Sequence, residues 1–381
     1  MQQVLRILTP EALLDKYTKK LANSALLQRL RDLEDLGLQT VVSGWNGSAV
    51  ALHVAALSQC LDKSVLLLLD DKEQAAYLYN DVQKFLGESN SLFYPASYRR
   101  PYQSDEVNNA NVLLRVECVN KMHAARKPFV MVTYPEAVFE KIISKKAIKS
   151  GGISLKQGQE YAAEALNEKL FELNFKRVDF VTEPGEFSLR GGILDVFSFS
   201  NDEPYRIEFF GDEIDSIRSF DIETQLSIKK INKIHILSNI EEKQLEEQRV
   251  PVFEHLSKEA LVFCANSSRI AEHLQSLYDK ADESYRSMNA TVAQMKPEAL
   301  FLDKKSFRQA LTHRKGVELT SARASEERPS FSFDISPQPV FHKNFDLLIE
   351  QLNANTSKNY ENLICCASEK QAKRLSDIFS D

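Results

Sequence analysis

The first 150 residues alternate between amphipathic helical segments and short apolar runs, and this alternation constrains the fold more than any other feature. The runs that we expect to form strands are Gln39–Val42, Ser64–Leu69, Leu92–Tyr94 and Pro128–Thr133. The segments that we expect to form helices are Leu21–Leu36, Ala49–Cys60, Glu73–Phe85, Asn109–Ala125 and Pro135–Ser144. A helix between successive strands is typical of βαβ units, whose strands are parallel. We therefore predict an α/β domain with a mostly parallel sheet.

The pattern changes at the pair Gly151-Gly152. One helical segment, Tyr161–Leu173, is followed by closely spaced strand patterns with turn residues between them, which indicates antiparallel pairing. Helix and strand signals mix again from residue 224, and a polar stretch at 320–329 has the composition of a linker. We therefore predict one α/β domain made of residues 1–151 and 224–329, split by an α+β insert at 152–223.

A further βαβ pattern begins near residue 330. Strand patterns at Pro339–Phe341 and Asn362–Cys366 flank a helical segment at Asn344–Leu352, and a second one follows at Glu369–Phe379. One or two strands cannot close a core. We expect residues 330–381 to be the start of a small third α/β domain and the chain to be a fragment of a longer protein.

Composition narrows the class of partner. The 381 residues carry a net charge of −6, whereas surfaces that bind DNA are usually basic, so a protein partner is favoured. The five cysteines form no CxxC pair and the histidines show no HxxxH spacing, so we expect no metal site. A signal peptide is not indicated, and the longest apolar run, Val65–Leu69, is too short to cross a bilayer. We expect a cytoplasmic protein without membrane contact.

The turn between the first expected strand and helix stands where a phosphate-binding loop would stand. A working loop reads GxxxxGK[ST], because the lysine reaches the β- and γ-phosphates and the hydroxyl holds Mg²⁺. Counting from Gly44, and with a further glycine at Gly47, the second glycine, lysine and hydroxyl positions hold Ala49, Val50 and Ala51. Either this is a degenerate nucleotide loop, or the glycines only shape a tight βα turn. Both interpretations predict no ATP hydrolysis.

A predicted hairpin at 205–215 carries an aromatic residue on the wrong face. The period of two places Tyr205, Ile207 and Phe209 on a core face, and Arg206, Glu208 and Phe210 on the face that should be wet. An arginine and an aromatic residue about 13 Å apart on one face are typical of a protein-binding hot spot. Alternatively, a bulge near Gly211 turns Phe210 inward, or a second layer covers it. The acidic pair at 212–213 fits a two-residue turn better than a metal-binding strand end.

Arg190 is the second arginine of interest. It precedes the pair Gly191-Gly192, and paired glycines within a strand pattern usually mark a bulge or a close backbone approach. Arg190 is therefore expected at an exposed strand edge. It is either part of a binding surface or an ordinary solvated arginine.

Residues 184–225, PGEFSLRGGILDVFSFSNDEPYRIEFFGDEIDSIRSFDIETQ, resemble a signature shared by the excision-repair protein UvrB and the transcription-repair coupling factor. LFYPASYRRPYQSDEVNNANVLLRV and VTYPEAVFEK are similar to further segments of these proteins, so the resemblance spans about residues 20–381. UvrB keeps an intact phosphate loop, whereas the amino-terminal region of the coupling factor has lost the lysine. The loss of the lysine here makes the sequence resemble the coupling factor.

The resemblance implies a fold, a partner and a site. The fold would be a degenerate P-loop (RecA-like) domain split by an insert that binds the repair protein UvrA. The contact residues of that family match Arg190, Arg206 and Phe210. No cofactor and no ATPase activity are implied for this chain. Binding of RNA polymerase and DNA, and ATP-dependent translocation, would belong to other domains of a longer protein.

Two other classes of function are open at this stage. A UvrB-like ATP-dependent helicase module would need the groups that Val50 and Ala51 replace, and ATP turnover would reveal it. A module that recognises damaged DNA directly would show salt-sensitive DNA binding, which the net charge disfavours.

Overall fold

The computed structural model describes residues 6–97, 102, 109–144, 152–198, 203–237, 249–287, 295–320, 328–336, 341, 344–366, 370–371 and 373–375. Much of the expected linker at 320–329 and of the expected helix at 369–379 lies outside these residues. Of the expected strand at 339–341, only residue 341 is described.

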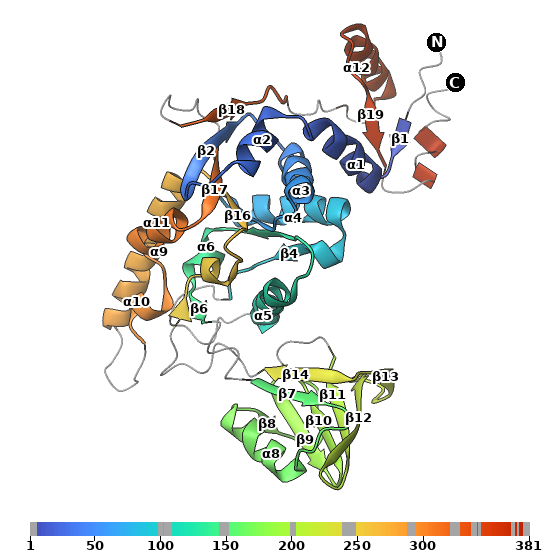
Figure 1. The fold of residues 1–381 in the computed structure, drawn as a ribbon, viewed down its shortest axis with the longest axis vertical. Helices are drawn as coiled ribbons and strands as arrows, with labels where there is room; N and C mark the ends of the chain where they lie inside the picture. The colour runs from blue at the N-terminus through green and yellow to red at the C-terminus, as the bar shows by residue number, and fades with distance from the viewer. Residues whose placement is uncertain are drawn as a thin grey trace.

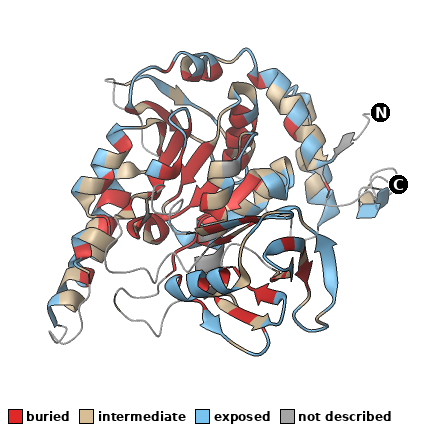
Figure 2. Cartoon of the chain, turned by 60° about the horizontal axis from the view of Figure 1, so that its bottom comes forward, coloured by how far each residue is buried: buried red, intermediate tan, exposed pale blue. Residues whose placement is uncertain are grey.

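Seven parallel strands form the sheet of the larger body, in the order β18-β2-β17-β16-β3-β5-β4 (Figure 1). They are β2 (Gly37–Ser43), β3 (Val65–Leu68), β4 (Ser91–Phe93), β5 (Val130–Thr133), β16 (Leu261–Ala265), β17 (Lys315–Thr320) and β18 (Ser330–Ser332). Every residue of β3, β5 and β16 is buried, as in a parallel sheet covered on both faces (Figure 2). The predicted α/β class and parallel sheet are confirmed.

Two groups of helices accompany this sheet. The first group is α1 (Pro10–Leu21), α2 (Ala25–Arg31), α3 (Ala49–Leu61) and α4 (Lys72–Leu86). In this group α1, α2 and α4 each contact α3. In the second group, α6 (Pro135–Phe139), α10 (Pro297–Leu300) and α11 (Lys304–Thr312) pack on α9 (Ser267–Ser287). The other helical elements that the structure describes in this body are α5 (Asn109–Ala124), η1 (Glu88–Asn90) and η3 (Val252–His255).

Three helices differ from the sequence expectation. The helix expected at 21–36 is shortened to α2, because the Ser24 side chain caps it by accepting a hydrogen bond from the Leu27 N–H. The preceding helix α1 was missed, although Thr9 and Pro10 supply its N-cap and first position. The helix expected to continue to residue 144 ends at 139. There Glu140 turns to bind the Ser97 hydroxyl, and β6 (Ile142–Ile143) pairs with β15 (Arg249–Val250).

The smaller body is built on a six-stranded sheet in the order β13-β12-β11-β10-β9-β8 (Figure 1). Its strands are β8 (Lys176–Arg177), β9 (Glu186–Arg190), β10 (Ile193–Val196), β11 (Tyr205–Phe210), β12 (Glu213–Phe220) and β13 (Ser227–Lys230), and only the β8–β9 pair is parallel. Helix α8 (Ala163–Glu172) packs on one face through Leu166 and Leu170. The predicted α+β composition and antiparallel pairing are therefore present.

This body extends further along the chain than the sequence indicated. Strand β14 (Lys233–Leu237), which we expected in the α/β domain, pairs antiparallel with β7 (Gly152–Lys156). Ile234 and Ile236 join the same core as α8. The alternation of charged and apolar residues in β14 suits this half-buried position, and a boundary at 223 would leave the core uncovered.

A third group of elements lies beside α1. Strand β19 (Leu363–Cys365) pairs in parallel with β1 (Arg6–Leu8), and α12 (Phe345–Ser357) precedes it (Figure 1). Glu361 forms ion pairs with Lys16 and Lys20 of α1. That these elements begin a small third domain stays a prediction. Within the described ranges, no helix is long and apolar enough to cross a membrane.

Candidate functional site

Strands β9, β10 and β11 bring the predicted contact residues to one face of the six-stranded sheet. Asp195 of β10 pairs with Arg206 of β11, and Ile193 of β10 pairs with Arg190 of β9. Because side chains alternate between the two faces of a strand, these four residues project from the same face. We call it the outer face; its members are Arg190, Ile193, Asp195, Arg206 and Phe210. The opposite face carries the core against α8.

One buried carboxylate holds both arginines. Asp195 is 1% exposed, and its Oδ1 accepts a hydrogen bond from Arg206 Nε at 2.7 Å. Its Oδ2 accepts from Arg206 Nη2 at 2.9 Å and from Arg190 Nη2 at 2.8 Å. The pairing with Arg206 is therefore bidentate, which fixes the plane of the guanidinium group. The hydrogen bond to Asp195 raises the pKa of Arg206 although burial opposes the rise.

Aromatic rings support both guanidinium groups. The Cζ atom of Arg206 lies 4.4 Å from the centre of the Phe220 ring, and that of Arg190 lies 5.0 Å from the Phe180 ring. Both distances suit a cation–π contact. Phe220 is buried, whereas Phe180 is 60% exposed. Arg206 therefore packs against a buried phenylalanine, and Arg190 lies beside a phenylalanine that is exposed to solvent.

The two arginines differ in access to solvent. The side chain of Arg190 is 44% exposed, as expected for a strand edge, but that of Arg206 is only 18% exposed. Arg206 is less exposed than the hairpin pattern predicted, because it also donates to the backbone and side-chain oxygens of Gln225, at 3.2 and 3.3 Å. Arg190 is thus the arginine that offers more of its charge to a partner.

Phe210 is the most exposed aromatic side chain of the described sheet, at 82%. It ends β11, and Gly211, at φ +62°, starts the two-residue turn into β12. Tyr205 and Ile207 are buried on the opposite face, as the period of two predicted. The irregularity in the ladder leaves an extra residue on β12, at Asp215, rather than turning Phe210 inward. The alternative of an inward Phe210 is therefore wrong.

Other apolar side chains extend this surface, and sequence reasoning missed them. Ile193 is 38% exposed beside Arg190, and Leu226 is 69% exposed next to Gln225, the acceptor of Arg206. With Phe180 they rim the arginines with apolar area, which is typical of an interaction surface. An isoleucine directly after the glycine pair and an aspartate within the apolar run GILDVF were the sequence signals for Ile193 and Asp195.

The loop between β2 and α3 holds the second set of predicted positions. Gly44 and Gly47 have φ of +82° and +53°, conformations that favour glycine. Val50 and Ala51 are 8% and 0% exposed and belong to the hydrophobic core. Ala49 starts α3. The positions of a lysine and a metal-binding hydroxyl therefore point into the core. This geometry fits a tight βα turn, and its interpretation as a degenerate phosphate loop stays a prediction.

The chain itself covers this loop. The N–H of Phe333 donates to the Ser43 carbonyl at 2.9 Å, and Asn46 Nδ2 donates to the Ile335 carbonyl at 2.7 Å. A Cβ atom on Gly44 would lie 1.7 Å from the Phe333 carbonyl oxygen. The Trp45 ring lies 5.7 Å from the Phe333 ring between centres. Residues 333–335 thus lie directly against the backbone that would have to bind phosphate.

Neutral residues also follow β16, whose end lies at the same edge of the sheet. Asn266 and Ser267 come directly after this strand, and neither side chain carries a charge. Asn266 Nδ2 donates to Asp70 at 2.7 Å, and Ser267 Oγ donates to Glu318 at 2.7 Å. Across the described part of the chain, no group of three or more His, Cys, Asp or Glu side chains could hold a metal ion.

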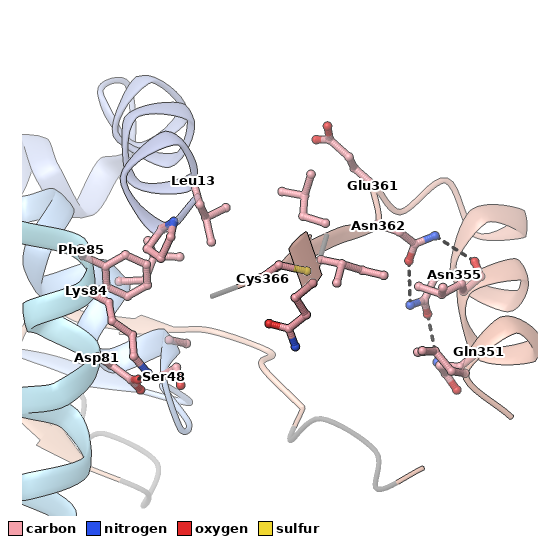
Figure 3. Close-up of a pocket in the computed structure, with 18 of the residues that line it drawn as sticks. Leu13, Ser48, Asp81, Lys84, Phe85, Gln351, Asn355, Glu361, Asn362 and Cys366 are labelled. Carbon is pink, nitrogen blue, oxygen red and sulfur yellow. Dashed lines mark hydrogen bonds and ion pairs between the residues drawn. The ribbon is translucent and has the colours of Figure 1, made fainter. Parts of the chain in front are cut away.

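A cleft of about 890 Å³ separates α1, α3 and α4 from α12 and β19 (Figure 3). Most of its lining is apolar, with Leu13, Leu52, Phe85, Leu348 and Leu352 among the contributors. Ser48 and Ala49 are the loop residues that reach it, and no member of the outer face does. The cleft brings together no set of side chains suited to catalysis.

The sequence of the smaller body matches a known protein family. Residues 153–241 match the family described as the UvrB interaction domain. The matched residues include every member of the outer face. The match also begins and ends near β7 and β14, the strand pair that closes this body.

Relatives of known name are transcription-repair-coupling factors. The chain is 30% identical over 202 residues to that of Bacillus subtilis, 26% identical over 202 residues to that of Escherichia coli, and 31% identical over 212 residues to that of Staphylococcus epidermidis. These matches cover 52%, 53% and 55% of this chain but only 17%, 17% and 18% of the relatives. The resemblance predicted from the sequence is confirmed, and the matches span less than a fifth of the length of these three relatives.

Proposed function

We propose that this chain is a binding module for UvrA that serves transcription-coupled nucleotide excision repair. One observation carries the proposal: within the segment that matches the UvrB interaction domain, an exposed Phe210 shares one sheet face with the fixed guanidinium of Arg190. Aromatic and arginine side chains dominate the energetics of protein interfaces. The outer face would offer a partner the exposed aromatic ring of Phe210 and the positive charge of Arg190.

We further propose that the chain does not hydrolyse ATP and needs no cofactor. Burial of Val50 and Ala51 and the neutral Asn266 support this, because nothing at the loop could stabilise charge on a transferring phosphoryl group. A UvrB-like helicase role is thereby disfavoured. In a longer protein of the coupling-factor kind, acting in the cytoplasm, RNA polymerase binding, DNA binding and ATP-driven translocation would belong to other domains.

The test is calorimetric titration of the chain with purified UvrA. Wild type should bind, and Phe210→Ala and Arg190→Ala should each cost about 2 kcal/mol or more of binding free energy. Arg206→Ala should cost as much, partly because buried Asp195 would lose two of the three hydrogen bonds that it accepts from the arginines. Tyr77→Ala is the matched control, since Tyr77 is a 75% exposed aromatic residue on α4 of the other body. It should bind like wild type.

Three outcomes would contradict parts of the proposal. A folded wild-type chain that does not bind UvrA would overturn the function. Binding that is equal for wild type, Phe210→Ala and Arg190→Ala would keep the function but move the site elsewhere. ATP turnover by the purified chain would restore the helicase alternative.

A further inference from the structure

We propose that Asp195 is the positioning residue of the partner-binding surface. This inference rests on the proposed function. It assigns the orientation of Arg190 and Arg206 to one buried carboxylate that contacts no partner itself. Asp195 is 1% exposed, so it can act on a partner only through the two side chains that it holds.

Arg206 and Arg190 differ in how many of their N–H groups are hydrogen-bonded within the chain. Arg206 donates from Nε and Nη2 to Asp195 and from Nη1 and Nη2 to Gln225. Its guanidinium therefore bridges β10 to Gln225, between β12 and β13, and most of its N–H groups are satisfied within the chain. Arg190, among the described residues, donates only from Nη2 to Asp195. Its other N–H groups are the ones that a partner can use.

The charges of the cluster also support a positioning role for Asp195. Two guanidinium groups share one carboxylate, so the cluster keeps a net charge of about +1 at neutral pH. Without Asp195, the positive charges of Arg190 on β9 and Arg206 on β11 would face each other across β10 with no carboxylate between them. They would repel each other, and Arg190 would move into solvent. A partner would then have to order a free arginine, which costs conformational entropy on binding.

The alternative is that Asp195 only stabilises the fold. The two roles differ in one respect: a positioning residue loses its effect on binding when the side chains that it positions are absent. Binding must therefore be compared between the natural background and one that carries Arg190→Ala and Arg206→Ala together. The substitution to use is Asp195→Asn, because it keeps the shape and removes the charge.

The experiment measures UvrA affinity for four chains: wild type, Asp195→Asn, the double arginine variant and the triple variant. Asp195→Asn should weaken binding about tenfold or more in the natural background, because two arginines lose their order. In the arginine-free background it should change affinity less than about threefold. Asp215→Asn is the matched control on an exposed carboxylate of the same sheet, and it should bind like wild type. Circular dichroism confirms that each variant is folded.

The outcomes separate the inference from the proposed function. Wild-type affinity in Asp195→Asn would overturn the inference and leave the function standing. Equal losses in both backgrounds would show that Asp195 acts through the fold, which also overturns it. No binding by folded wild type would instead remove the proposed function. Should Asp195→Asn not fold, Arg190→Lys decides. It keeps the charge but not the planar guanidinium, so undiminished binding would overturn the inference.

Discussion

The larger and the smaller body of this chain each contain an arginine that pairs with a buried carboxylate, but the two arginines differ in exposure to solvent. In the body of the parallel sheet both sheet faces are covered, and Arg115 of α5 and Glu140, which follows α6, form an ion pair whose side chains are 2% and 6% exposed. Arg115 also donates to the carbonyls of Pro95 and Ala137, so its charge serves the packing of the body. In the antiparallel sheet one face is packed against α8 and the other is covered only in part, and there Asp195 holds the half-exposed Arg190.

The comparison teaches where function can reside in such a chain. A sheet with both faces covered leaves only its strand ends and loops for ligands. In this chain, residues 333–335 cover the loop at one of these ends. A sheet with one free face keeps a broad surface on which large side chains can stand exposed. The antiparallel body therefore carries the candidate site, although it is the smaller of the two.

The largest expected effect concerns the covered loop. Val50→Lys restores the lysine of a phosphate loop but places an unpaired charge in the core, so it should lower the free energy of unfolding by about 3 kcal/mol or more. Urea unfolding followed by fluorescence of Trp45 measures this, since Trp45 is the single tryptophan and lies in this loop, next to Gly44. Gln59→Lys, on the exposed side of the same helix, is the control and should change stability little. Equal stability of the two variants would show that position 50 is not buried.

Two adjacent phenylalanines sharpen the contrast between the faces of the open sheet. Phe209 is half-buried against the core, so Phe209→Ala should cost about 2 kcal/mol of stability in the smaller body. Phe210→Ala should stay within about 0.5 kcal/mol of wild type, because its ring is in solvent. Hydrogen exchange of the β10–β12 amides measures both. Comparable losses for the two variants would contradict the assignment of Phe210 to the outer face.

A smaller effect separates the two glycines of the loop. Gly44→Ala should cost about 2 kcal/mol, because alanine is strained at this positive φ and its Cβ meets the Phe333 carbonyl. Gly47→Ala has open space around the Cβ and should cost only about 1 kcal/mol of strain. Both are measured by Trp45 fluorescence during urea unfolding. If Gly47→Ala is the more damaging change, residues 333–335 do not cover the loop.

The smallest effect is a dependence on pH. Burial lowers the pKa of His53 below its ordinary value of 6.5, although a hydrogen bond to the Ala49 carbonyl opposes the shift. The unfolded chain then binds more protons than the folded chain below pH 6.5, so stability should fall as pH falls through this window. His53→Gln should lose less stability than wild type between pH 7.5 and 5.5. His313→Gln, at an exposed position, should follow wild type. A slope for His53→Gln as steep as that of wild type would contradict this.

Local sequence determined much of this protein. The alternation of helix and strand signals predicted the parallel sheet, because burial on both faces demands continuous apolar strands such as Val65–Leu68. The period of two placed Phe210 opposite the core, and the absence of a lysine at Val50 predicted that the loop does not support ATP hydrolysis. Each of these properties is set by neighbours within a few residues. The resemblance of residues 184–225 indicated the similarity to transcription-repair-coupling factors that the comparisons found.

Tertiary structure alone decided the rest. The assignment of β14 to the antiparallel body depends on pairing with β7, which lies far away in the sequence. Arg206 is partly buried because Asp195 and Gln225, from other segments, converge on its guanidinium. The loop at Gly44 is covered by residues 333–335, almost 300 positions later. Local patterns determine which face a side chain occupies, but contacts between distant segments determine what meets it there.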